Sequence, residues 1–91
     1  MGFLDSMFKS VQKGMMSQFG INRPRDALRV LENIIRSNRD DEDKVRYAKP
    51  ILMWLKKLSL SNDSQASEAN YVLDEVRSRY EYFLDENSLR V

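Results

Sequence analysis

Residues 40–43 form the densest group of side chains in this sequence that could do chemistry, because Asp40, Asp41, Glu42 and Asp43 are four acidic residues in a row. Hard cations such as Ca²⁺ bind clusters of carboxylate oxygens. The segment lacks the alternating ligands, the central glycine and the terminal glutamate of an EF-hand loop. Acidic residues also favour the positive end of a helix dipole, and Asp40 or Asp41 can cap a helix. The pattern therefore predicts a solvated helix N-terminus and no metal site.

Arginines recur along the segment before this acidic group and could contact phosphates, as one basic helix face does in many nucleic-acid binders. They are Arg25, Arg29, Arg36 and Arg39. Glu32 follows Arg29 by three residues and precedes Arg36 by four, a spacing at which side chains of one helix can form ion pairs. Ion pairs on a solvated face therefore explain much of the arginine series, and nucleic acid is not the expected partner.

The sequence contains no cysteine and no histidine. This composition excludes disulfides, thiolate nucleophiles, Cys/His zinc sites and the usual general base near neutral pH. We therefore predict a protein that is not an enzyme and that carries no cofactor. A chain without cysteine is consistent with a reducing compartment. Asp5, Lys9 and Lys13 interrupt the apolar stretch that a secretory signal needs, so a cytoplasmic location is expected.

The chain of 91 residues, of which 42% are hydrophobic and 32% charged, has the length and composition of one globular domain. Its net charge of +1 hides an asymmetry. Residues 1–39 carry seven basic and three acidic side chains, whereas residues 59–91 carry three basic and seven acidic ones. The chain could therefore pair its own oppositely charged halves, or pair head to tail with a second copy, and a small domain gains stability from such burial.

Apolar residues recur at helical spacing in three segments after residue 22, which are residues 23–37, residues 41–60 and a segment from about residue 62 to 86. The apolar faces comprise Ala27, Leu28, Leu31, Ile34 and Ile35; Val45, Ala48, Ile51, Leu52, Leu55 and Leu58; and Ala66, Ala69, Leu73, Val76, Tyr80, Phe83 and Leu84. Pro50 lies inside the second segment, but the apolar phase is the same on both sides of it, so one helix kinked at Pro50 is predicted. Asn62 and Gln65 have the spacing of a capping box, so they are predicted to begin the third helical segment.

Residues 1–20 predict a further amphipathic helix, and the four segments together predict an all-α bundle of about four amphipathic helices. Gly20 suits a helix C-cap, and Pro24 suits the first turn of the next helix. The apolar face of the N-terminal helix gathers Phe3, Leu4, Met7, Phe8, Val11, Met15 and Phe19.

Three interpretations remain open for this N-terminal face. It can pack on the protein's own core, dock into a partner or a second copy, or lie in a membrane interface as a helix that detaches from the domain. Met-rich helical faces adapt to irregular protein grooves. Membrane-surface helices usually carry more Lys and Arg than Lys9 and Lys13 alone, so a protein surface is favoured over lipid.

The stretch MGFLDSMFKSV at residues 1–11 resembles the N-terminal amphipathic helix of the PspA family of bacterial membrane-remodelling proteins. The rest of the chain lacks the long coiled-coil hairpin of that family. The resemblance is therefore confined to these residues and implies nothing for the remainder of the fold.

Tyr71 and Tyr82 lie on the predicted outer face of the last helix, where they either form a binding stripe or pack beneath the first helix or a second copy. We predict a small non-enzymatic helical protein that acts by protein–protein interaction or as a homodimer, in the role of adaptor, inhibitor or structural accessory. The predicted partner-binding residues are Phe3, Leu4, Met7, Phe8, Val11, Met15, Phe19, Tyr71 and Tyr82. The alternative is a peripheral membrane protein anchored by residues 1–20.

Overall fold

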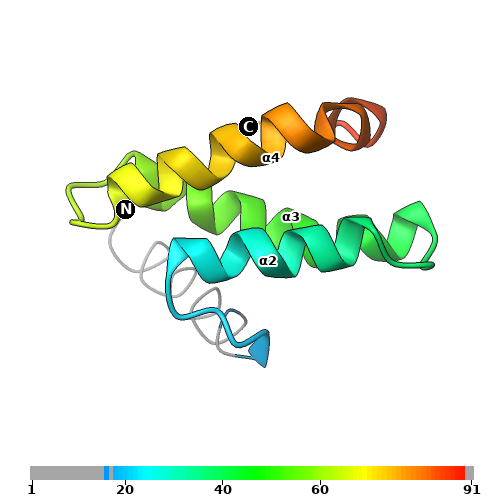
Figure 1. Ribbon diagram of the computed structural model, residues 1–91, viewed down its shortest axis with the longest axis horizontal. Coiled ribbons are helices and arrows are strands. Elements are labelled where there is room, and N and C mark those ends of the chain that lie inside the picture. The colour runs from blue at the N-terminus through cyan, green and yellow to red at the C-terminus, as the bar shows by residue number, and fades with distance from the viewer. Residues whose placement is uncertain (1–15, 17, 90–91) are drawn as a thin grey trace, which may run out of the picture.

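The computed structural model describes residue 16 and residues 18–89, and these residues form three helices and no strand. The helices are α2 (Pro24–Ile35), α3 (Asp41–Ser59) and α4 (Ala66–Glu86), and short loops join them (Figure 1). The predicted all-α fold and the three predicted helical segments after residue 22 are therefore confirmed. The fourth predicted helix, in residues 1–20, lies almost entirely outside the described residues, so a bundle of four helices is not confirmed.

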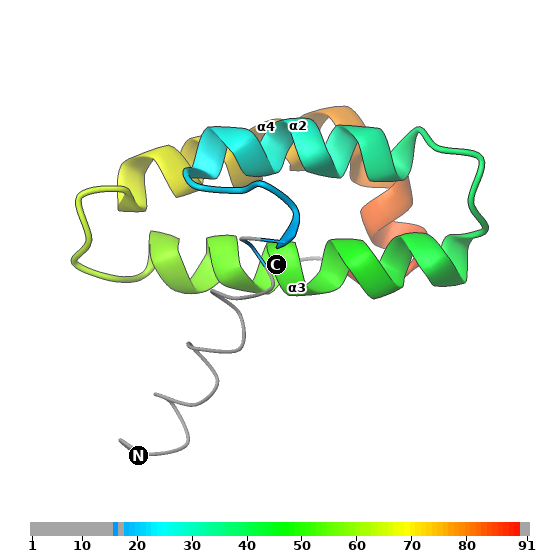
Figure 2. The ribbon, with the colours of Figure 1, turned by 90° about the horizontal axis from the view of Figure 1, so that it is seen from below.

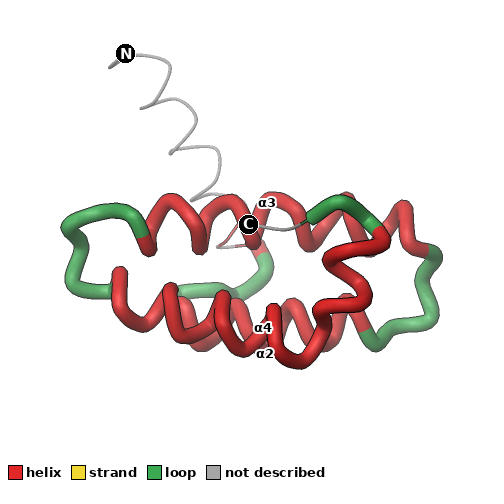
Figure 3. Tube along the Cα trace, turned by 90° about the horizontal axis from the view of Figure 1, so that it is seen from above, coloured by secondary structure: helices red, strands yellow, loops and turns green. Residues whose placement is uncertain are grey.

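The three helices pack against one another as a bundle. α2 and α4 lie side by side and run in the same direction, while α3 packs on both and runs antiparallel to them (Figure 2). Residues 36–40 and 60–65, which connect the helices, lie at opposite ends of the bundle (Figure 3). This order follows from the short loops, because a short connection forces consecutive helices to be antiparallel neighbours.

The core lies where the predicted apolar faces of the three helices meet. Each helix contributes one fully buried alanine, namely Ala27, Ala48 and Ala69, and these small side chains let the helices approach closely. Larger side chains fill the space around them: Leu31, Ile51, Leu52, Leu55, Val72, Leu73, Val76 and Leu84 are all buried. Burial of a leucine or isoleucine side chain contributes about 1.5–3 kcal/mol, so this cluster supplies most of the stability of the domain.

Two of the predicted helix starts are confirmed. Oδ1 of Asp40 accepts a hydrogen bond from the backbone N–H of Asp43 at 2.9 Å, which makes Asp40 the N-cap of α3. Pro24 is the first residue of α2, where its fixed φ suits the helix and its missing N–H is not needed. The acidic residues after Asp40 occupy the first turn of α3, next to the positive end of the helix dipole.

The predicted capping box of Asn62 and Gln65 is wrong. α4 begins at Ala66, and Gln65, which precedes it, makes no side-chain capping bond. The backbone N–H of Gln65 donates instead to Oδ1 of Asp63 at 2.8 Å, so an aspartate in the loop orders this turn. Asp63 and Gln65 are two residues apart, which is the spacing of an Asx turn rather than of a capping box.

α3 continues across Pro50 as one helix, as predicted from the constant apolar phase, but the predicted kink at Pro50 is not confirmed. Pro50 is half-buried and lies on the half of α3 that faces away from Ala48 and Leu52. The carbonyl of Arg46, which loses its hydrogen bond to residue 50, is therefore on the outer side, where water can satisfy it. This position explains why the helix tolerates the proline.

The described helices do have a break, at Tyr80 in α4, which the sequence analysis did not predict. The φ and ψ angles of Tyr80 are −129° and 30°, so the helix changes direction there. The part of α4 that follows crosses toward α3 (Figure 3) and buries Phe83 and Leu84 in the core. Ser88, with φ at 55°, then ends the element.

Candidate interaction surfaces

The part of the N-terminal segment that the structure describes is attached to the core. Gly20 has φ at 73°, and the N–H of Ile21 donates to the carbonyl of Met16 at 2.9 Å, which is a Schellman-type helix end. Met16 and Ile21 are buried, with 2% and 4% of their surface exposed. Any detachable part of the segment must therefore end before Met16.

Phe19 lies at the edge of this attachment. Its ring is half-buried and meets the ring of Tyr47 on α3 edge-on, with the centroids 6.0 Å apart and the planes at 88°. Phe19 therefore packs on its own domain in this structure. The other predicted partner-binding residues of the segment lie outside the described residues: Phe3, Leu4, Met7, Phe8, Val11 and Met15.

The outer side of α4 carries the two predicted tyrosines, and both are exposed as expected. Tyr71 exposes 51% and Tyr82 75% of its surface. The exposed residues on this side of α4 are Tyr71, Asp74 and Ser78 before the break at Tyr80, and Tyr82 and Glu86 after it; together they are called the acidic face below. A hydrogen bond from the Tyr82 hydroxyl to Glu86, together with the negative charges of Glu86 and Asp41, raises the pKa of Tyr82. The hydroxyl is therefore a stable hydrogen-bond donor on this face.

α3 carries a second exposed surface that the sequence analysis did not single out. Met53 exposes 37% and Leu60 75% of its surface. The surface around them comprises Arg46, Lys49, Met53, Lys57 and Leu60, all exposed, and is called the basic face below. Residues 44–60 include five lysines and arginines and no acidic residue. Helical phase could have identified Met53, which falls outside the stripe formed by Ala48, Leu52 and Leu55.

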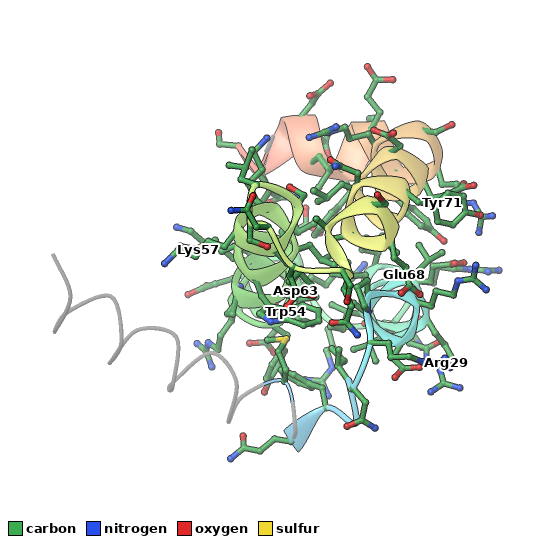
Figure 4. All side chains as sticks on the ribbon, turned by 90° about the vertical axis from the view of Figure 1, so that its left-hand side faces the viewer. Arg29, Trp54, Lys57, Asp63, Glu68 and Tyr71 are labelled. Carbon is green, nitrogen blue, oxygen red and sulfur yellow. The ribbon has the colours of Figure 1, made fainter. Side chains whose placement is uncertain are left out.

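The two faces point to different sides of the molecule. In the view along the bundle, Lys57 extends outward from α3 on one side and Tyr71 extends outward from α4 on the opposite side (Figure 4). Trp54, by contrast, lies on the side of α3 toward residues 16 and 18–21 and is packed against the core (Figure 4). The basic face at Lys57 and the acidic face at Tyr71 therefore point away from each other.

A polar cluster links α2 to α4 and holds Glu32, which lies on the inner edge of α2. One carboxylate oxygen of Glu32 is 3.0 Å from Nη1 of Arg79, and the other accepts a hydrogen bond from the Tyr80 hydroxyl at 3.0 Å. Nε of Arg79 also binds Glu75 at 3.2 Å. Partial burial of Tyr80, and then its hydrogen bond to Glu32, raises the pKa of this hydroxyl. The cluster therefore lies at the break in α4.

The expectation that Glu32 pairs with Arg29 or Arg36 on its own helix is therefore corrected. Glu32 binds across the bundle because Tyr80 and Arg79 reach it from α4. Two arginines of the predicted series also contact other elements, since Arg25 is 3.2 Å from Glu68 on α4 and Arg39 lies 5.0 Å over the ring of Tyr47. Arg25 and Arg39 thus contribute contacts between elements of the fold.

No group of three or more acidic side chains in the described part of the chain is placed to hold a metal ion. Among α2, α3 and α4, no helix combines the length and the apolar character needed to cross a bilayer. The chain matches no protein-family model, no curated protein and no solved structure.

Proposed function

We propose that this protein is not an enzyme and acts by binding protein surfaces, a second copy of itself among them. The observation that carries this proposal is the exposure of large apolar side chains on two helices. Leu60 and Tyr82 each expose 75% of their surface, and Tyr71 exposes 51%. Removal of such side chains from water on binding contributes about 25 cal/mol for each Å² of apolar area.

The arrangement of these side chains supports binding to a protein. Single exposed apolar residues are common on any surface, but groups of them that are rimmed by charges mark interaction sites. Met53 and Leu60 lie among lysines and arginines, and Tyr71 and Tyr82 lie among carboxylates. Tyrosine adds area and a hydroxyl at a low cost in conformational entropy.

The polar cluster supports a non-catalytic role. Glu32, Arg79 and Tyr80 contact one another and hold α4 against α2. With no histidine or cysteine in the sequence, the described carboxylates would have to act without the usual general base or thiolate nucleophile. The contacts of these carboxylates serve helix caps and ion pairs.

The proposal is tested by immobilising the full chain and measuring what it retains from an extract of its native host and from a solution of the purified chain. Three baits are compared: the wild type, the double variant Leu60→Ser/Tyr82→Ser, and the control variant Asn33→Ser on the exposed side of α2. We expect the wild type and the control to retain the same protein, and the double variant to retain at least tenfold less, because about 1.4 kcal/mol of lost binding energy gives this factor.

Circular dichroism and thermal unfolding of the three baits establish that they fold alike. Equal retention by all three folded baits, or no specific retention by any of them, would contradict the proposal.

A second candidate is binding at an anionic membrane surface. The five basic residues within residues 44–60 and the apolar pattern of residues 1–20 favour it. Co-sedimentation with vesicles that contain phosphatidylserine tests this candidate. Sedimentation that is lost both at high salt and in the variant Phe8→Asp would support it, whereas no binding at low salt would remove it.

A further inference from the structure

We propose that the basic face of α3 binds the acidic face of α4 on a second copy, so that copies associate head to tail. This inference rests on the proposed function and names the partner and the two surfaces. The basic face centres on Met53 and Leu60, and the acidic face centres on Tyr71 and Tyr82.

The charges of the two helices decide which surfaces can meet. α4 carries six acidic and two basic side chains, whereas α3 carries three acidic side chains in its first turn and then five basic and no acidic ones over residues 44–59. A contact of the basic face with itself would place Lys49 and Lys57 against their own copies, and a contact of the acidic face with itself would do the same for Glu86. Like charges in such a contact cost free energy, while opposite charges align the partners and speed association. The favourable pairing is therefore basic face to acidic face.

The apolar side chains supply the rest of the contact. Met53 lies on α3 and Leu60 directly follows its last residue, so seven residues, or about 10 Å of helix, separate the two side chains. Tyr71 and Tyr82 are eleven residues apart in α4, on either side of the break at Tyr80. Each face thus presents two large side chains within a stretch of charges of one predominant sign. Aromatic residues and methionine are the types enriched at the centre of protein interfaces.

The geometry favours a head-to-tail contact over a closed two-fold dimer. A two-fold dimer that used both faces in one interface would need them to point to the same side of the molecule. Lys57 and Tyr71 instead extend to opposite sides (Figure 4). A contact between two different surfaces leaves one unused face on each end, and it therefore produces rings or open chains.

Two full-length variants, each altered on one face only, test this inference. Lys49→Glu/Leu60→Glu blocks the basic face, and Tyr71→Lys/Tyr82→Lys blocks the acidic face. All four positions are exposed, so both variants are expected to fold, and circular dichroism checks this. Sedimentation velocity then gives the mass of the wild type, of each variant, of an equal mixture of the two variants, and of the control Asn33→Ser.

The head-to-tail contact predicts that the wild type and the control form species larger than a dimer as concentration rises, and that salt weakens this association. Each variant alone should associate at least about tenfold more weakly. The mixture should form a complex of one copy of each variant and grow no further, because one intact basic face and one intact acidic face remain.

A mixture that stays monomeric while the wild type associates would overturn the inference but not the proposed function. A wild type that stays monomeric but retains a foreign protein would have the same consequence. Wild-type association that ends at a dimer, or that both variants retain, would also overturn it. A wild type that is monomeric and pellets with phosphatidylserine vesicles only when its basic face is intact would assign that face to a membrane.

Discussion

At the scale of single residues, the polar side chains of this protein mostly fix the ends and neighbours of helices. Asp26 shows how: its Oδ2 accepts hydrogen bonds from the backbone N–H groups of Asn22 and Arg23 at 3.1 and 3.2 Å, just before α2. The bond from Asn22, more than any other cause, lowers the pKa of Asp26 below its ordinary value of 3.8. The sequence placed Pro24 correctly at this helix start, but a bond from a side chain back to the preceding loop leaves no periodic signal.

The lowered pKa predicts how pH changes the role of Asp26. A carboxyl group whose pKa is lower in the folded state stabilises the fold above the unfolded value near 3.8, and this contribution is lost as pH falls through the folded pKa. Asp26→Ala should therefore lower the melting temperature at pH 7, and the difference from wild type should shrink as pH falls below about 4. Asp74→Ala, which removes an exposed ion pair, serves as the control. A difference that grows on acidification would contradict this role.

Tyr80 and Glu32 give a second prediction for single residues. Tyr80→Phe keeps the ring in the core and removes the hydroxyl, so it should cost about 0.5–1.5 kcal/mol, the usual contribution of one hydrogen bond. Urea unfolding of Tyr80→Phe, Glu32→Gln and the double variant measures this cost and the coupling between the two positions. Additive effects would show that the bond across α2 and α4 does not contribute to stability.

At the scale of elements, much of the fold could be predicted because helical periodicity reports burial directly. The apolar stripes around Leu31, Leu55 and Leu73 became the core. The break at Tyr80 could not be predicted from periodicity, because Phe83 and Leu84 continue the stripe across it. The contact of Glu32 with α4 was equally invisible, since its partners are 47 and 48 residues away along the chain. The binding role of Tyr71 and Tyr82 stays a prediction.

Two helix ends of the same type predict opposite changes in stability when their positive-φ residues are substituted. Gly20 and Ser88 both have positive φ, at 73° and 55°, and the residue after each donates to a carbonyl five positions earlier. Nothing lies within 4 Å of a Cβ added at Gly20, so Gly20→Ala should cost about 1–2 kcal/mol through backbone strain alone. Ser88→Gly should stabilise by up to about 1 kcal/mol for the same reason. Thermal unfolding measures the stability change of each substitution. If both substitutions stabilise the protein, or both destabilise it, the two helix ends do not share this geometry.

At the scale of the whole molecule, a small core makes stability depend on each buried side chain. Leu31→Ala, Leu55→Ala and Leu73→Ala should each cost about 2–5 kcal/mol, because each removes a fully buried side chain and leaves a cavity. Leu60→Ala, at a position that is 75% exposed, should change stability by less than about 0.5 kcal/mol. Urea unfolding compares the four. A large effect at Leu60 would show that this side chain serves the fold rather than a partner.

The same contrast separates the core from the surfaces that we assign to binding. The domain leaves Leu60 and Tyr82 largely exposed while it buries residues as small as Ala27, Ala48 and Ala69 completely. A second copy that covered the exposed side chains would bury apolar area that the single chain cannot. The central claim is therefore that the outer surfaces of α3 and α4 are sites of contact between molecules.

A concentration series of ¹H–¹⁵N NMR spectra of the full chain tests this claim most directly, because every backbone amide reports its own surroundings. We expect shifts that grow with concentration around residues 49–60 and 71–82, with the exposed side of α2 around Asn33 unchanged. Spectra that are identical from low to high concentration, or shifts that gather on α2, would contradict the claim.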